Sequence, residues 1–334
     1  MTSADVYAAG SLAGHVTREP DATTFTYAEG YDGPALVPHL PVGTTTWPAG
    51  ALPPLLSNLL PEGRRLEALR QQVKTSLDNE VALLLAIGND LVGDLQFVPA
   101  GTRPTGSSAT QIDLGRLDTL EFARLRGLPV SGVPGVQDKV KISERMSLPV
   151  RDASLSTHLL KFGQQGVAQL IANERACLQA LADARLEVSQ ADVVVDATGE
   201  TALLVTRFDR RVAHGTVTAL RQLDGCQAAG RYPADKEDLD TLDVVTALAG
   251  LCANRCMLRE RLSRCSLVML PPVAGRRSQS DQADACAGLT FHSLLPDPPG
   301  RGRACGWLHV HVLGRRSTPG RTCTRQGVQG SLLR

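Results

Sequence analysis

A change in amino-acid usage near Leu251 divides the 334-residue chain into two parts of different physical character. Up to residue 250 the sequence has 22 lysines and arginines against 30 aspartates and glutamates, a net charge of −8. From Leu251 onward it has no lysine, 13 arginines and four acidic residues, and six of the eight cysteines lie there. Prolines and glycines interrupt any hydrophobic period in this second part. We therefore expect the first 250 residues to build the regular fold.

The length of the chain predicts two domains with a sizeable core. Aromatic residues make up only 4% of the sequence, so leucine, valine and alanine must supply most of that core. No stretch reaches eighteen apolar residues, and Met1–Asp5 lacks the charged-then-apolar pattern of a secretion signal. These features predict a cytoplasmic protein without a membrane span.

The segment Ser131–Ile142 has the composition of a loop that holds an anion. Gly132 and Gly135 flank a bend, and polar residues then lead into an alternating apolar and polar run. Glycines in a turn let backbone N–H groups approach a phosphate closely. The segment is not a Walker loop, because no Gly-Lys-Ser/Thr follows, and it lacks the three glycines of a kinase or dinucleotide loop. An ordinary surface turn remains the alternative.

A strand and a helix follow this loop. Residues 156–162 alternate like a half-buried strand that ends near Lys161. Residues 168–184 have the period of an amphipathic helix, and Glu174 falls on or near its apolar face. A carboxylate there needs a partner, and we predict that Lys161 provides it, as in kinases that orient phosphates with a strand lysine and a helix glutamate. Alternatively, Glu174 reaches solvent at the edge of that face.

Two β-rich runs, residues 192–196 and 202–210, flank a turn at Ala197–Glu200 and predict a hairpin. The second run ends in a charged segment around Phe208. In a kinase-like lobe this exit is the hinge, whose backbone pairs with adenine.

The N-terminal quarter predicts a β-rich unit with helices. Short β-like runs fill residues 5–47, and residues 93–98 predict a returning strand. We interpret the basic run on the helix between them as a solvated face; it comprises Arg64, Arg65 and Arg70. Asp78 is a candidate N-cap for the next helix.

Further along, residues 99–111 predict a linker, and Leu114–Leu125 predicts one short helix that leads to the glycine loop. Residues 220–227 are interpreted as a crossover between two lobes, and Leu239–Leu251 as a helix.

Seven blocks of this sequence, in the same order, resemble the HipA family, the serine/threonine kinase toxins of bacterial toxin–antitoxin modules. They include LLPEG, GVPGVQDKVKI and STHLLKF, and they occupy residues 59–63, 82–99, 132–142, 156–162, 173–181, 203–211 and 222–230. The resemblance implies an α+β fold, a HipA-like two-lobed kinase whose C-terminal helical lobe is incomplete here. It divides the chain into an N-terminal subdomain (1–100), a linker with a connecting helix (101–125), a nucleotide-binding region (126–250) and an aberrant tail (251–334).

The same resemblance implies ATP and Mg²⁺ as cofactors. The residues implied to contact ATP are Pro134, Gly135, Val136, Gln137, Asp138, Lys139, Lys161, Glu174, Thr206, Arg207 and Phe208. One position departs from the family, because its self-phosphorylated serine aligns with Gly132, which leaves Ser131 as a displaced substitute. The implied partners are a helix-turn-helix antitoxin of the HipB type, through which DNA is contacted indirectly, and a protein substrate of the aminoacyl-tRNA synthetase class.

The likeness stops near Ser263. No Asp-x-His-x-Lys-Asn catalytic loop follows, and Asp281 and Asp284 are the only nearby acids, so no catalytic or metal-binding residue is identified. A lysine-free, arginine-rich tail is what GC-rich DNA encodes out of frame, and we interpret it as the result of a frameshift. We therefore predict a HipA-type kinase toxin that is inactive in this copy.

Alternatives for the tail and for the whole chain stay open. A metal site is disfavoured by the spacings; its candidate ligands are Cys252, Cys256, Cys265, Cys286, His309 and His311. A basic module could bind nucleic acid through phosphates, and a disordered or aggregating segment has the same composition. As a whole, the chain could be a pseudokinase that binds ATP or the antitoxin, or a basic-tailed nucleic-acid-binding protein without enzymatic activity.

Overall fold

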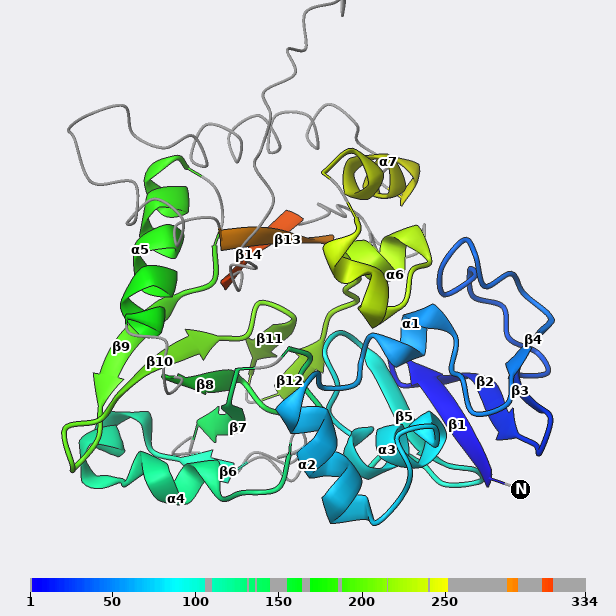
Figure 1. The fold of residues 1–334 in the computed structure, drawn as a ribbon, viewed down its shortest axis with the longest axis horizontal. Helices are drawn as coiled ribbons and strands as arrows, with labels where there is room; N and C mark the ends of the chain where they lie inside the picture. Colours follow the sequence, from blue (N-terminus) through cyan, green and yellow to red (C-terminus); the bar gives the residue numbers. More distant parts are fainter. Residues whose placement is uncertain are drawn as a thin grey trace, which may run out of the picture.

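Two five-stranded sheets, one in each half of the first 250 residues, form the framework of the molecule (Figure 1). The structure is a computed structural model, and it describes residues 2–105, 110–130, 132–135, 137–144, 155–163, 169–185, 188–214, 216–239, 241–251, 287–293 and 308–314.

The first sheet has the strand order β4-β3-β2-β1-β5, and every neighbouring pair is antiparallel. Its strands are β1 (Thr2–Ala8), β2 (Ser11–Arg18), β3 (Ala22–Tyr27), β4 (Thr44–Pro48) and β5 (Leu95–Pro99). Ala4, Val6 and Ala8 alternate into the core, as expected for a sheet with one face packed. The predicted β-rich N-terminal unit is thus present.

Three helices pack beside this sheet: α1 (Pro54–Ser57), α2 (Arg64–Val73) and α3 (Glu80–Ile87). Helix α3 buries Val81, Leu83, Leu84 and Ile87, so it is apolar on nearly all sides and lies within the core. The predicted cap Asp78 was off by one residue, since the side chain of Asn79 accepts the hydrogen bond from the Ala82 N–H.

The second sheet has the order β6-β7-β8-β10-β9, with β6 parallel to β7 and the other pairs antiparallel. Its strands are β6 (Thr110–Ile112), β7 (Lys139–Glu144), β8 (His158–Phe162), β9 (Ala191–Val195) and β10 (Thr201–Thr206). The predicted hairpin of β9 and β10 is present, with Gly199 at a positive φ of 84° in its turn.

The strand predicted at residues 156–162 is present as β8, but it is covered on both faces, so the expectation that it is half-buried was wrong. Leu159 packs with Ile171 and Leu178 of α5 (Leu170–Asp183), whereas Leu160 and Phe162 pack on the opposite face. A central strand covered by helices on both sides loses the alternation of buried and exposed residues. Figure 1 shows α5 and α4 on opposite sides of the sheet.

The segment predicted as one helix at 114–125 is divided in two. A 3₁₀ helix, η1 (Leu114–Thr119), precedes α4 (Phe122–Arg126). The Asp196 carboxylate, in the β9–β10 turn, accepts a 2.7 Å hydrogen bond from the Phe122 N–H at the start of α4. Phe122 and Asp196 are 74 positions apart in the chain, so the local sequence does not indicate this contact.

The chain then returns to the N-terminal unit. After a two-stranded sheet of β11 (Arg210–Ala213) and β12 (Thr216–Ala219), it forms α6 (Gly225–Ala229), η2 (Pro233–Glu237) and α7 (Thr241–Leu251). The Gln227 side chain donates to the Leu55 carbonyl of α1 at 2.8 Å. The segment at 220–227 therefore joins the two halves, and the helix predicted at 239–251 is present.

The tail contains one described element, an antiparallel pair of β13 (Ala287–Ser293) and β14 (Leu308–Gly314). A disordered segment was one of the alternatives for the tail, and these two strands differ from it. Of the candidate metal ligands in the tail, the four cysteines at 252, 256, 265 and 286 lie outside the described residues, as do Asp281 and Asp284. No helix in the described ranges combines the length and the apolar run that a bilayer crossing requires.

Candidate nucleotide-binding site

A buried ion pair joins the second sheet to its covering helix. The Nζ of Lys161, on β8, lies 2.5 Å from Oε1 of Glu174, on α5. Both residues are only 6% exposed. Because Ile171 and Leu178 fix α5 against the sheet, Glu174 between them faces the strand rather than solvent. The predicted pairing is present, and the alternative of a solvent-directed Glu174 is wrong.

The glycine-containing loop before β7 is held through its carbonyl oxygens. Arg65 of α2 donates to the carbonyls of Val133 at 2.5 Å and Gly135 at 3.0 Å. The Lys139 ammonium donates to the Pro134 carbonyl at 2.7 Å. Gly135 has a φ of +95°, a conformation that L side chains rarely adopt, so a glycine is required there.

The C-terminal end of the loop is fixed to β8. The Gln137 side chain donates to the Phe162 carbonyl at 2.9 Å, and the Phe162 N–H donates to the Asp138 carbonyl at 2.9 Å. These contacts place the loop directly beside the strand that carries Lys161. Val136 and Ser131, two further predicted contacts or sites in this loop, lie outside the described residues.

Arg65 corrects one interpretation of the sequence. The basic run at residues 64–70 was expected to be a solvated helix face, but Arg65 is only 5% exposed. Burial lowers the pKa of its guanidinium to about 10, and Asp138 and Glu62 offset this effect only in part. Its contacts lie about seventy residues further along the chain, so no local signal distinguishes it from Arg64, which is more exposed.

Position 132 has no room for a side chain, which accounts for the glycine there. A Cβ atom there would lie 2.8 Å from Cδ2 of Leu91 and 2.9 Å from the carbonyl oxygen of Ile87. Real Cβ atoms essentially never approach other atoms this closely, so a serine at position 132 would require the loop to move away from α3.

In the predicted hinge, residues 206–208, two backbone amides form hydrogen bonds within the protein. The Thr206 N–H donates to the Gln190 carbonyl, and the Arg207 N–H donates to the Thr157 carbonyl. In this arrangement neither amide can also pair with a ligand. The Arg207 side chain is buried away from the Lys161 pair, in a cluster of charged residues that the sequence did not indicate.

That cluster joins the N-terminal unit to the second sheet. Asp90, which follows α3, accepts from Arg210 at 2.8 Å and lies 3.2 Å from the Lys141 ammonium. Asp209 accepts from Arg207 at 2.6 Å and from Arg210 at 2.9 Å. Burial alone would raise the pKa of the Asp209 carboxyl, but the two arginines together lower it to about 2. The same type of environment lowers the pKa of Asp90.

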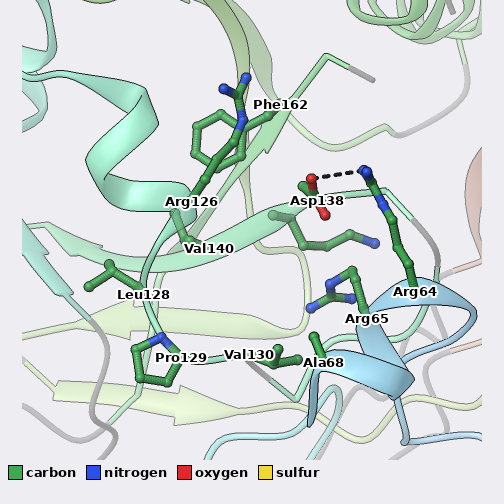
Figure 2. A pocket seen from close by; sticks show the side chains of 11 residues that line it. Arg64, Arg65, Ala68, Arg126, Leu128, Pro129, Val130, Asp138, Val140 and Phe162 are labelled. Atoms are coloured by element: carbon green, nitrogen blue, oxygen red, sulfur yellow. Dashed lines mark hydrogen bonds and ion pairs between the residues drawn. The ribbon is translucent and has the colours of Figure 1, made fainter. Parts of the chain in front are cut away.

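A hollow of about 210 Å³ lies between α2, the segment after α4 and the start of β7. Figure 2 shows Arg64 and Arg65 entering from α2, with Arg126 on another side, over the Phe162 ring. The Arg126 guanidinium carbon lies 4.8 Å from the centre of that ring. Lys139 and Asp138 also line the hollow.

Comparison with known proteins agrees with this architecture at the level of the family. The model of the HipA N-terminal domain matches residues 4–98, and that of the HipA-like C-terminal domain matches residues 131–270. The chain belongs to the HipA family. The two matches together cover the N-terminal unit, the glycine loop, the Lys161–Glu174 pair and α6 and α7, and the second extends seven residues beyond the point where the likeness was expected to stop.

Two curated relatives are 31% identical to this HipA-family chain. One is the serine/threonine-protein kinase toxin HipA of Shewanella oneidensis, over 229 residues, 63% of this chain and 52% of the relative. The other is the protein Y4mE of Sinorhizobium fredii, over 201 residues, 55% of this chain and 47% of the relative. The chain therefore spans about half the length of the curated relatives it matches.

A solved structure shares the fold. It is the Shewanella oneidensis MR-1 toxin–antitoxin complex of HipA, HipB and operator DNA, with a TM-score of 0.64 and 21% sequence identity. The superposition covers 93% of this chain and 74% of the solved chain. The two-lobed α+β architecture expected from the sequence is thus confirmed.

Proposed function

We propose that this HipA-family chain binds ATP beside the Lys161–Glu174 pair, with the 132–139 loop next to the phosphates. The buried ion pair carries the proposal. Kinases use a strand lysine held by a helix glutamate to position the nucleotide phosphates. Here the 2.5 Å contact with Glu174 holds the Lys161 ammonium in one orientation.

The charge balance around the loop supports a polyphosphate ligand. Arg65 and Lys161 are buried basic residues, Lys139 is a partly buried one, and Glu174 is the carboxylate paired with Lys161. Burial strongly lowers the pKa of Lys139, and the charges of Arg65 and Lys161 lower it further. A polyanion would offset this repulsion. The adenine contact is proposed at the hinge, residues 206–208, as the family resemblance implies, and the amides of Thr206 and Arg207 would have to exchange their present carbonyl partners for it.

Phosphoryl transfer needs more than this site. A metal must be held on the transferred phosphate, and a carboxylate must orient the attacking hydroxyl. No group of three His, Cys, Asp or Glu side chains that could hold a metal occurs among the described residues. Mg²⁺, which the family resemblance implies, would be held by the phosphates of ATP. The 334-residue sequence contains no Asp-x-His-x-Lys-Asn block, so we propose that this copy binds nucleotide without transferring phosphate.

Thermal unfolding with and without MgATP tests nucleotide binding. A ligand that binds only the folded state raises the melting temperature by mass action. We expect MgATP to raise it for the native sequence and not for Lys161→Ala, while Lys74→Ala, which removes an exposed lysine, keeps the full shift. A shift of equal size in Lys161→Ala would place the nucleotide elsewhere.

The DNA sequence of the gene tests the origin of the tail. We propose that residues beyond about 263 are read out of frame, because lysine disappears and arginine, cysteine and proline accumulate there. One of the two other frames downstream of codon 262 should then encode lysines and an Asp-x-His-x-Lys-Asn block, followed by a second acid. Two closed frames, or open frames without these acids, would favour the basic nucleic-acid-binding tail instead.

A helix-turn-helix antitoxin is the proposed protein partner. The supporting observation is that the solved structure with the same fold is a complex of HipA with HipB and operator DNA. Co-purification of this chain with an antitoxin encoded next to its gene would test the proposal. If the frame is restored, the proposed activity is ATP-dependent phosphorylation of a cytosolic protein of the aminoacyl-tRNA synthetase class.

A further inference from the structure

Helix α2 of the N-terminal unit contacts the glycine-containing loop at both of its ends and in its middle. At the start of the loop the Val130 N–H donates to the Gln72 side chain at 3.2 Å. In the middle Arg65 donates to two loop carbonyls. At the end Arg64 contacts Asp138 at 2.8 Å, and Figure 2 draws this contact as a dashed line. The loop therefore runs antiparallel to α2, from the last turn of the helix to its first.

The residues of α2 that contact the loop are spaced for one side of a helix. Arg65 and Gln72 are seven positions apart, so they lie on the same side, about 10 Å from each other along the axis. On the neighbouring side, Leu69 and Val73 pack in the core of the N-terminal unit, and Val130 packs against the same core. One side of α2 is thus anchored in the core, and the side next to it holds the loop.

The first turn of α2 is fixed by a contact with η2. The Glu62 carbonyl, just before the helix, accepts a 3.2 Å hydrogen bond from the Arg65 N–H. The Glu62 carboxylate accepts from the Lys236 ammonium of η2 at 2.6 Å. Lys236 also lies 4.0 Å from the Asp224 carboxylate. The backbone of Arg65 is therefore held by contacts other than those its side chain makes with the loop.

We propose that α2 is the positioning element of the nucleotide loop, and that Arg65 and Gln72 are positioning residues that hold the loop in the form that accepts the phosphates of ATP. This inference rests on the ATP site proposed above. An anion-binding turn presents its N–H groups to the ligand. Carbonyls that are turned toward Arg65 keep the negative ends of their dipoles away from a bound polyanion.

A loop that is ordered before the ligand arrives also makes binding more favourable, because less conformational freedom is lost on association. Removing a contact between α2 and the loop should therefore weaken the binding of ligands that carry phosphates. Adenosine has no phosphate to place against the loop, so its affinity should not depend on α2. The comparison of ATP with adenosine thus separates a positioning role from a general effect on the fold.

ATP affinities of the full chain, measured by calorimetry in the presence of Mg²⁺, test this role. Gln72→Ala removes the acceptor of the Val130 N–H without a change of charge, and it should weaken ATP binding about fivefold. Gln71→Ala is the matched control, because Gln71 donates to Glu67 rather than contacting the loop. Arg65→Gln, which alters both carbonyl contacts, should weaken ATP binding by about tenfold or more.

Amide hydrogen exchange in the ligand-free protein provides a second measurement. The loop, residues 132–139, should exchange faster in Gln72→Ala and Arg65→Gln than in the native sequence, and at the native rate in Gln71→Ala. Gln72 is exposed, so its replacement leaves the core intact even if Arg65→Gln does not fold. Adenosine should bind the variants and the native sequence with equal affinity.

Native ATP affinity and native loop exchange in Gln72→Ala and Arg65→Gln would overturn the proposal. An equal loss in Gln71→Ala, or a parallel loss of adenosine affinity, would also overturn it, because either result indicates an effect on the whole fold. Lys161→Ala separates this inference from the ATP site. Loss of ATP binding in Lys161→Ala alone would support the site and exclude the role of α2, whereas no ATP binding to the native sequence would contradict both.

Discussion

At the scale of single residues, long-range electrostatics decides which charged side chains are buried. Glu174 was placed correctly from the sequence because a carboxylate on an apolar helix face requires a cation, and Lys161 was the candidate within reach. Arg65, Asp90 and Arg207 were missed, because the contacts Arg65–Val133, Asp90–Arg207 and Asp90–Arg210 join residues 68, 117 and 120 positions apart, and no local pattern indicates them.

Removing one member of the Lys161–Glu174 pair is expected to destabilise the fold. Glu174→Ala leaves a buried ammonium without its carboxylate, which costs about 3–5 kcal/mol. The double variant Lys161→Met/Glu174→Leu removes both charges and should recover most of that loss. Urea unfolding measures all three free energies, with Arg175→Ala on the same helix as the control. A double variant as unstable as the single one would show that packing, rather than charge, determines the stability here.

At the scale of elements, the sequence predicts strands and helices better than their boundaries and their exposure. The β9–β10 hairpin and α5 follow from their own periodicity. The burial of both faces of β8 could not be predicted in this way, because a helix packs on each face and the strand does not alternate between buried and exposed residues. The split between η1 and α4 depends on Asp196, a distant turn residue that caps α4. Local propensity therefore gives the element type, and tertiary contacts set its ends.

Helix α6 depends on its capping box. The Asp224 carboxylate accepts from the Gln227 N–H at 2.7 Å, and the Gln227 side chain accepts from the Asp224 N–H at 2.9 Å. Asp224→Ala should lower the free energy of unfolding by about 1–2 kcal/mol, and Asp224→Asn by much less, because asparagine also caps well. Asp238→Ala, an exposed neighbour, is the control. Equal losses in the alanine and asparagine variants would show that charge, not capping, is required.

At the scale of the whole molecule, the charged cluster around Asp90 and Asp209 joins the N-terminal unit to the segment that was expected to be the hinge. Arg210 contacts both aspartates and the carbonyls of Leu91 and Gly93. Since these groups are buried, the two halves are expected to unfold together in a single transition. The family resemblance gave the architecture, but the residues that hold its halves together could be identified only in the folded chain.

Acid should weaken this connection. The folded-state pKa of Asp209 is lowered to about 2, from an ordinary value of 3.8, so its contribution is complete above pH 3.8 and is lost as the pH falls toward 2. Asp209→Asn should be less stable at neutral pH and lose less stability between pH 4 and 2. Asp118→Asn, which is exposed, is the control for pH titrations of the melting temperature. If the melting temperature of Asp209→Asn falls with acid as steeply as that of the native sequence, Asp209 does not contribute to the acid sensitivity of the charged cluster.

Incubation of the purified chain with γ-labelled MgATP tests the central claim most directly, because bound and covalently transferred label are separated in one experiment. The account predicts saturable, reversible retention of nucleotide by the native sequence, its loss in Lys161→Ala, and no covalent label on the chain or on added aminoacyl-tRNA synthetases. Mg²⁺-dependent covalent label that disappears in Lys161→Ala would contradict the claim that this copy transfers no phosphate. Absence of any retained nucleotide would contradict the ATP site itself.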